Sequence, residues 1–172
     1  MDGAVRTLFA VSILACVLTA LASAQSKTPD VGLQQVSFVR DSVANVDMQV
    51  LKLLTGSIWL LSRPTLALVT DEVVIVLIDS KRGVLFHEGD EIPVSYVSGA
   101  TVVEKGLRGR VVEAMGDGAI LRLNDNSLWE VPSYDRFHTS FWLPPYPVLI
   151  TGNSLYMVNL KKGKQIWVKR VR

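Results

Sequence analysis

A tryptophan-containing block that occurs twice, seventy positions apart, limits the possible folds of this chain more than any other feature of its sequence. Each copy of the block combines a turn, a serine, an aliphatic residue and a tryptophan. One further block precedes it and two follow it, in the same order in both copies and with loops of different length between them. The aligned blocks are 36–39 with 110–113, 52–61 with 122–131, 73–75 with 147–150, and 89–94 with 163–168. Four blocks in one order indicate a tandem duplication.

Each copy has the pattern of short β-strands. Apolar residues alternate with others in 48–53 and 120–123, and β-branched residues are frequent. The segments 55–57 and 124–127 supply Gly, Asn, Asp and Ser, which tolerate the positive φ of tight hairpins. Helical periodicity is lacking after the N-terminal region, and small units with many short strands close into barrels because closure removes exposed edges.

We therefore predict an all-β fold of two tandem small β-barrel-like modules, SH3-like or OB-like. The first module covers residues 34–103 and the second covers 104–172. Strand alternation puts Trp59 and Trp129 on the face opposite their aliphatic neighbours. A tryptophan present in both copies is better explained as a core or module-contact residue than as an exposed platform for a sugar or peptide. Ser57 and Ser127 complete the structural repeat.

The run from Asn124 to Val131 resembles the Asp-Gly-Ser-x-Trp-x-Val modules of small, mostly uncharacterised exported bacterial proteins. Trp142, Val148 and Ile150 extend the likeness over about 50 residues of the second copy. The first copy matches more loosely. The resemblance implies a small β module and no particular chemistry. Asn126 stands where these modules have Gly, which Asn can replace because it also adopts left-handed backbone conformations.

Residues 1–24 have the order of a secretory signal peptide. Arg6 precedes an apolar run from Leu8 to Leu21, and small residues lead to an expected cleavage after Ala24. The alternative is a lipoprotein, because Cys16 follows Ile-Leu-Ala within the apolar run. We expect the protein to be exported: the mature protein is periplasmic or secreted, with membrane attachment only if Cys16 is lipidated.

Cleavage after Ala24 removes the only cysteine, so no disulfide or zinc–thiolate site is expected in the mature chain. Residues 25–33 are a polar linker to the first module. Charge differs between the modules: 30–103 contains nine acidic and five basic residues, whereas 104–172 contains six acidic and eleven basic residues. Opposite charges favour docking of one module on another, within a chain or in a homo-oligomer.

Two regions of the second module are candidates for binding. The C-terminal hairpin and its closing strand are rich in lysine and arginine, which indicates either a solvated strand edge or a site for an anionic envelope component or an acidic protein, but not for nucleic acid. The loop between Trp129 and Val148 is rich in aromatics and prolines, and is either a recognition surface or a lid over the barrel end. The candidate binding residues are Phe141, Trp142, Tyr146, Lys161, Lys162, Lys164, Lys169 and Arg170.

No convincing catalytic, metal or cofactor motif is found in the sequence. His87 stands beside acidic residues in a turn but has no second histidine at ligand spacing. Asp135 and His138 offer the residue types of a hydrolase without a known spacing. The sequence thus favours a non-enzymatic, exported two-module scaffold that binds another macromolecule. A salt-sensitive self-assembler and a hydrolase that uses Asp135 and His138 are the alternatives.

Overall fold

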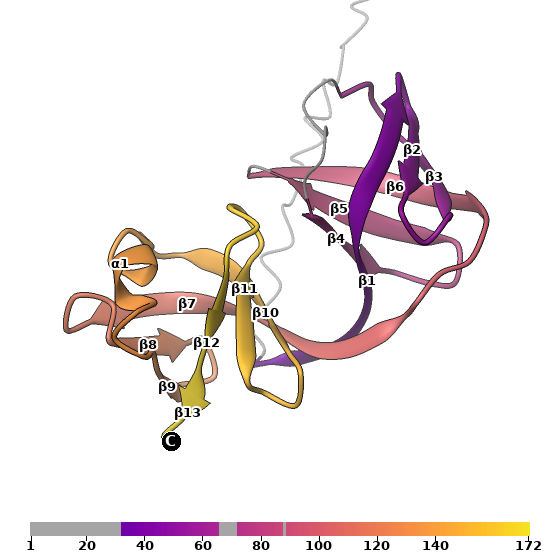
Figure 1. Cartoon of the computed structure of the whole chain (residues 1–172). Helices are drawn as coiled ribbons and strands as arrows, with labels where there is room; N and C mark the ends of the chain where they lie inside the picture. Colours follow the sequence, from indigo (N-terminus) through magenta and orange to yellow (C-terminus); the bar gives the residue numbers. More distant parts are fainter. Residues whose placement is uncertain (1–31, 66–71, 88) are drawn as a thin grey trace, which may run out of the picture.

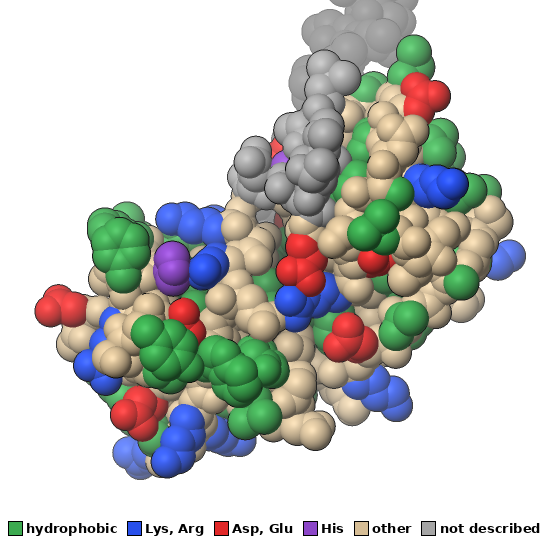
Figure 2. All heavy atoms as spheres, in the orientation of Figure 1, with side chains coloured by type: hydrophobic (Ala, Val, Ile, Leu, Met, Phe, Trp, Pro, Cys, Tyr) green, Lys and Arg blue, Asp and Glu red, His purple; other side chains and the backbone are tan. Residues whose placement is uncertain are grey.

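The computed structural model describes residues 32–65, 72–87 and 89–172. The expected signal peptide, Cys16 and residues 25–31 of the expected linker lie outside this part. The described chain is all-β: a six-strand antiparallel barrel with seven more strands attached, plus one short helix (Figure 1). The all-β barrel fold predicted from strand alternation is therefore confirmed. The space-filling view shows two adjacent lobes (Figure 2).

The elements are short except for two long strands, β1 and β7. The first six strands are β1 (Gln34–Asp47), β2 (Val50–Leu53), β3 (Ile58–Leu61), β4 (Glu72–Leu77), β5 (Arg82–His87) and β6 (Asp90–Ser98). The remaining elements are β7 (Glu104–Met115), β8 (Ile120–Leu123), β9 (Leu128–Glu130), α1 (Arg136–Thr139), β10 (Tyr146–Thr151), β11 (Tyr156–Asn159), β12 (Gln165–Trp167) and β13 (Lys169–Arg170).

Strands β1–β6 form the first barrel. β1 pairs with β2, β2 with β3, β3 with β6, β6 with β5, β5 with β4, and β4 returns to β1. β1 closes this circle because it is long and its register shifts between Val43 and Asn45, so that different parts of it pair with β4 and β2. Irregularities of this kind bend a strand, as closure of a small barrel requires.

Strands β7–β13 form a second strand group. β7 pairs with β8 and β10; β8 pairs with β9, and β9 with β13. On the other side, β10 pairs with β11, and β11 with β12. Only Val168 separates β12 from β13. β7 also carries a register shift, between Val111 and Glu113.

The strand registers match the Trp blocks but correct one sequence alignment. Val43 lies opposite Leu53 just before the β1 irregularity, as Val111 lies opposite Leu123 just before that of β7. This register makes Val111 the counterpart of Val43, so the alignment of 36–39 with 110–113 is wrong. The error arose because that match rested on strand alternation alone, without a turn or a tryptophan to fix its position.

Three clusters of buried residues make the core. The first, inside the first barrel, contains Val39, Val43, Leu51, Leu53, Trp59, Leu61, Val73, Ile75, Leu85, Ile92 and Val94. The second, within the second strand group, contains Val111, Leu121, Leu123, Trp129, Val131, Trp142, Val148, Ile150, Met157, Ile166 and Val168. The third joins the two parts and contains Phe38, Val74, Val76, Phe86, Leu149, Val158 and Leu160.

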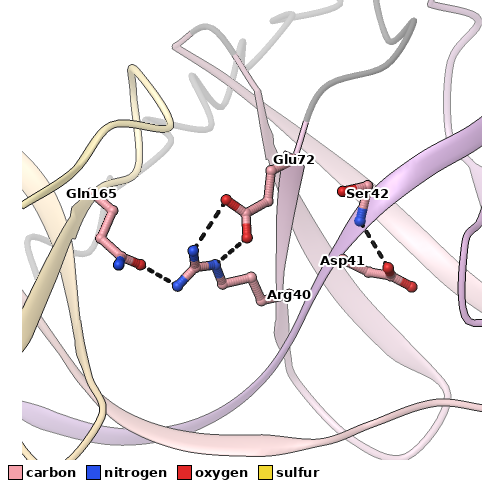
Figure 3. A network of polar contacts seen from close by, with 5 residues as sticks. All are labelled: Arg40, Asp41, Ser42, Glu72 and Gln165. Carbon is pink, nitrogen blue, oxygen red and sulfur yellow. Dashed lines mark hydrogen bonds and ion pairs between the residues drawn. The ribbon is translucent and has the colours of Figure 1, made fainter.

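Backbone pairing and two arginines also join the parts. Residues 34–38 of β1 pair antiparallel with 104–108 of β7, with Ser37 opposite Lys105. The guanidinium of Arg40 contacts Glu72 of the first barrel and Gln165 of β12 (Figure 3). Arg108 of β7 reaches from the second strand group to the first barrel, where its guanidinium lies over the ring of Phe86, 5.1 Å from the ring centroid.

Candidate functional site

The two repeated tryptophans are buried in equivalent hairpins. The indole N–H of Trp59 donates to Ser57 Oγ at 3.1 Å, and that of Trp129 donates to Ser127 Oγ at 2.8 Å. Both side chains are almost fully buried, at 1% and 0% exposure. These indoles therefore lie in the core and offer no face to a ligand. Their serines satisfy a buried N–H that would otherwise lack a partner.

The most distinctive feature of the second strand group is the connection between β9 and β10. We call residues 132–145 the aromatic loop. It carries α1, a single helical turn that strand alternation did not predict. Asp135, just before α1, is buried, and its carboxylate accepts the backbone N–H of Trp167 at 2.9 Å. This bond ties the aromatic loop to β12.

The end of α1 is fixed against the turn between β7 and β8. The hydroxyl of Thr139 donates to Gly118 O at 2.7 Å, and the Thr139 side chain is fully buried. A Cβ at Gly118 would lie 2.5 Å from Ser140 N, so this close approach needs glycine. The loop is thus held at two points by side chains, which fix it against the second strand group.

Neighbouring residues of the aromatic loop divide between core and surface. Trp142 is 2% exposed and belongs to the second core cluster, as the lid interpretation predicts. Its burial leaves it no role in contacting a partner. Phe141, in contrast, is 57% exposed and packs edge-to-face on Phe137, with 5.3 Å between ring centroids. The lid interpretation is therefore confirmed for Trp142 but not for Phe141, which it also placed in the core.

An exposed apolar patch results at the tip of the aromatic loop. Phe137 is 71% exposed, Leu143 75% and Tyr134 67%. Figure 2 shows hydrophobic side chains standing out over α1, next to basic side chains. Contiguous exposed apolar surface of this kind marks interaction sites in folded proteins.

Three lysines lie next to the aromatic loop, in the turn between β11 and β12. We call residues 160–164 the lysine turn. The ammonium groups of Lys161 and Lys162 lie 5.4 and 6.0 Å from the ring centroid of Tyr146, the first residue of β10. The turn is shaped by buried Asn159, whose Oδ1 accepts the backbone N–H groups of both lysines at 3.0 and 3.3 Å. In Figure 1, α1 and this turn both lie on the upper side of the second strand group, with the start of β10 between them.

The predicted basic patch is split by the fold. Lys161, Lys162 and Lys164 precede β12, whereas Lys169 and Arg170 follow it in β13, near the C-terminus at the lower edge in Figure 1. The Arg170 guanidinium lies over the ring of Trp129, 5.9 Å from its centroid. Arg170 therefore covers a core indole, and the structure brings only the lysine turn together with Tyr146 and the aromatic loop.

Charge pairing differs between the two parts. In the first barrel, acidic side chains are matched by arginines: Glu72 by Arg40, Asp79 by Arg82 and Asp90 by Arg63. Among the described residues, no carboxylate lies within ion-pair distance of a lysine-turn ammonium group. The positive charge of the lysine turn is therefore available to a partner.

The hydrolase alternative has no support from the arrangement of its residues. The Asp135 carboxylate accepts the Trp167 N–H, and the His138 ring contacts Phe137, with 5.8 Å between centroids. In the described part of the chain, no hydrogen bond joins this carboxylate to the imidazole. A catalytic base is normally oriented by such a bond.

No group of three or more His, Cys, Asp and Glu side chains is arranged to hold a metal ion within 32–65, 72–87 and 89–172. Over the same ranges, no helix has the length and apolar character needed to cross a membrane.

Sequence reasoning did not propose Leu143 or Trp167 as site residues, and it covered Phe137 only as one of the aromatic residues of the loop. Trp167 is 44% exposed and stacks on Tyr156, with 4.1 Å between ring centroids. Alternation gave a usable signal for Trp167, because it lies between Ile166 and Val168, which are both buried. Phe137 and Leu143 lie in an irregular loop, which has no side-chain alternation from which their exposure could be predicted.

Comparison with known proteins adds no family: no family model, curated protein or solved structure matches this chain. The resemblance of 124–131 to modules of exported bacterial proteins stays a prediction.

Proposed function

We propose that β7–β13 are a second copy of the first barrel. The pairing order supports this, since β8, β9 and β13 follow one edge of β7 as β2, β3 and β6 follow β1. On the other edge, β10, β11 and β12 correspond to β4, β5 and β6. The last strand of the copy is then β12 continued by β13. Each copy has six strands, one more than an OB-fold, so we propose a six-stranded barrel module rather than an OB-like one.

The contact between the parts supports an approximate two-fold relation between the copies. With Val43 and Val111 as counterparts, Ser37 corresponds to Lys105, and these two residues pair with each other. In the same correspondence Val36 matches Glu104, and Phe38 matches Gly106. The pair Val36–Gly106 on one side of Ser37–Lys105 is therefore equivalent to the pair Phe38–Glu104 on the other side. A surface that meets its own counterpart in this way has the form of an isologous interface.

The arginine contacts follow the same relation. Arg40 and Arg108 are counterparts, as are Gln165 and Glu91 in the aligned blocks. Arg40 reaches Gln165, and Arg108 lies 3.9 Å from a carboxylate oxygen of Glu91. Each copy thus extends one arginine to the same position on the other. A duplicated module that once paired with itself accounts for this arrangement.

We infer that the protein is a non-enzymatic, exported scaffold that binds another macromolecule of the envelope or of the extracellular space. The observation that carries this proposal is the exposed Phe137–Phe141 pair on a loop held in place by Asp135 and Thr139. Exposed aromatic side chains on a fixed loop contribute contact area at low entropic cost, which is typical of recognition surfaces. Export is proposed from the sequence of residues 1–24.

The charge of the lysine turn favours an anionic partner. Self-assembly, in which the acidic module of one chain meets the basic module of another, is less favoured because Glu72, Asp79 and Asp90 are already paired with arginines in their own barrel. A sedimentation mass that rises at low salt and falls at high salt would support self-assembly instead.

The proposal is tested by capture from envelope extracts with immobilised protein that begins at Gln25. We expect a component retained by the wild type to be lost from the double variant Phe137→Ser/Phe141→Ser. The matched control is Val102→Ser/Val103→Ser, which changes two exposed apolar residues between β6 and β7. An identical set of retained components for all three proteins would contradict the proposal.

A further inference from the structure

We propose that the aromatic loop and the lysine turn together dock on the surface of a lipid bilayer that contains anionic head groups. This inference rests on the proposed function, because it names the partner of the same surface. It commits to a bilayer; an acidic protein surface is an outcome of the test below.

The apolar part of the surface is suited to the interfacial region of a bilayer. Phe137, Phe141 and Leu143 are all more than half exposed and belong to one short loop. The loop cannot turn them inward, because Trp142 already fills the adjacent core position and Thr139 holds the end of α1. Apolar side chains that stay exposed on a folded loop gain free energy when they enter an acyl-chain boundary.

The polar part of the surface is suited to anionic head groups. Lys161 and Lys162 lie over the ring of Tyr146, which directly follows the aromatic loop, so the ammonium groups lie beside the C-terminal end of that loop, three residues after exposed Leu143. Lysine side chains reach past apolar surface to place their charge in water or among head groups. Tyrosine is itself enriched at membrane interfaces. Each basic residue near an anionic leaflet adds to the attraction.

The shape of the surface favours a bilayer over a folded partner. In Figure 2 the hydrophobic side chains over α1 stand out from the lobe and do not line a hollow. A folded partner would need a pocket shaped for this protrusion. A bilayer adapts to it without any complementary shape, and only the combination of apolar tip and flanking positive charge is required.

Vesicle co-sedimentation tests the proposal on protein that begins at Gln25. Vesicles of phosphatidylcholine with phosphatidylglycerol provide the anionic surface, and pure phosphatidylcholine provides the neutral control. We expect the wild type to sediment with the anionic vesicles and to be released by high salt. Phe137→Ser/Phe141→Ser should lower the partition coefficient at least tenfold, because two aromatic rings no longer enter the interface.

The charge contribution is tested separately with Lys161→Gln/Lys162→Gln. Each lysine removed should weaken binding to anionic vesicles about fivefold at low salt, the equivalent of about 1 kcal/mol per basic residue. Lys52→Gln/Lys81→Gln is the matched control, since both residues are exposed lysines of the first barrel. This control should bind within twofold of the wild type.

The depth of contact is measured with a dye. Protein that begins at Gln25 lacks cysteine, so Leu143→Cys introduces a single labelling site. An environment-sensitive fluorophore at this position should shift to the blue on addition of anionic vesicles. The same fluorophore on Val102→Cys, which is 62% exposed in the connection from β6 to β7, should not shift.

Three outcomes would overturn the bilayer proposal: no sedimentation of the wild type with anionic vesicles, equal sedimentation of wild type and Phe137→Ser/Phe141→Ser, or a fluorescence shift at residue 102 but not at 143. If the wild type fails to bind vesicles yet retains an extract component that the double Phe variant loses, the bilayer is wrong and the binding function stands. If neither experiment separates the variant from the wild type, both proposals fail. Near-ultraviolet circular dichroism of each variant verifies that its core is intact.

Discussion

The first barrel and the second strand group bury their repeated tryptophans in the same way, but a different type of residue packs on each indole. Trp59 lies opposite Tyr96 in β6, and the two rings pack edge-to-face at 5.3 Å. Trp129 lies opposite Arg170 in β13, whose guanidinium covers the indole. The buried hairpin is therefore kept, while the residue that covers it changes from aromatic to cationic. The two parts share the Trp hairpin and its strand pairing. They differ in the residues that cover this hairpin and in the loops between strands.

The connection after β9 shows the same separation. The aromatic loop adds Trp142 to the second core and presents Phe137 and Phe141 to solvent, without disturbing the pairing of β8 with β9. We therefore propose a binding function for the aromatic loop, whereas the paired strands with their buried tryptophans stabilise the fold. The predictions below test how far the two parts are equivalent, beginning with the largest expected effect.

Replacement of either repeated tryptophan tests the equivalence most directly. Trp59→Ala and Trp129→Ala should each lower the free energy of unfolding by about 3–5 kcal/mol, because each removes a fully buried side chain and leaves a cavity. Chemical denaturation monitored by far-ultraviolet circular dichroism measures both values. A loss below about 1 kcal/mol for only one of them would break the comparison.

A glycine at the contact between the parts tests the approximate two-fold relation. In the proposed duplication Gly106 corresponds to Phe38, and a Cβ at Gly106 would lie 2.6 Å from Ile150 O and 3.1 Å from the Phe38 ring. Gly106→Ala should lower the free energy of unfolding by about 1–3 kcal/mol, because the clash involves backbone. Gly106 does not have positive φ, so this loss reports the clash and not backbone strain; Gly32→Ala, also outside the positive-φ region and with only an ordinary 3.4 Å contact to Asp125 Cβ, is the control. An unchanged free energy of unfolding for Gly106→Ala would contradict the close contact.

The serines beneath the two indoles should have smaller and similar effects. Ser57→Ala and Ser127→Ala each leave a buried indole N–H without its acceptor. Each should lower the free energy of unfolding by an amount towards the lower end of about 1–3 kcal/mol. Ser127 should cost more than Ser57, since its hydroxyl also donates to Asp125. Thermal denaturation of the two variants gives the order. The reverse order would show that the hairpins are held differently.

The smallest effect concerns pH and the turn between β4 and β5. The backbone N–H of Lys81 and the guanidinium of Arg82 hold the pKa of the Asp79 carboxyl below its ordinary value. A folded-state pKa below the unfolded value means that Asp79 stabilises the fold above the unfolded pKa, and that this contribution is lost as the pH falls through the folded pKa. The corresponding turn of the second strand group, Gly152–Leu155, has no acidic residue. The amide protection factor, which corrects for the pH dependence of intrinsic exchange, should therefore fall on acidification more in the first turn than in the second. Asp79→Asn should remove the difference, and equal acid sensitivity of the two turns in the wild type would contradict this assignment.

The strands and the Trp hairpins could be predicted from the sequence, because their signals lie in neighbouring residues. The turn residues Gly56 and Asn126 mark the Trp hairpins, and both have positive φ in the structure, at 94° and 66°. Side-chain alternation around such turns was enough to predict an all-β barrel fold. The starts of β1 and β7 were aligned wrongly, since they pair with each other across 68 or so residues and have no local marker.

The candidate site was less predictable, for geometric reasons. Phe141 and Trp142 are adjacent, but an irregular loop has no period that tells which of them faces the core. The basic residues were predicted as one patch because they are close in sequence. An extended chain advances about 3.3 Å per residue, so Lys164 and Lys169 are carried to different ends of β12.

The antiparallel pairing of β1 with β7 has a consequence for how the chain unfolds. Phe38 and Val74 of one part and Leu149 and Val158 of the other share a buried cluster, and neither part can leave without exposing it to water. Loss of structure in one barrel therefore removes apolar cover from its neighbour. We expect a single calorimetric transition for the whole described chain rather than two separate melting events.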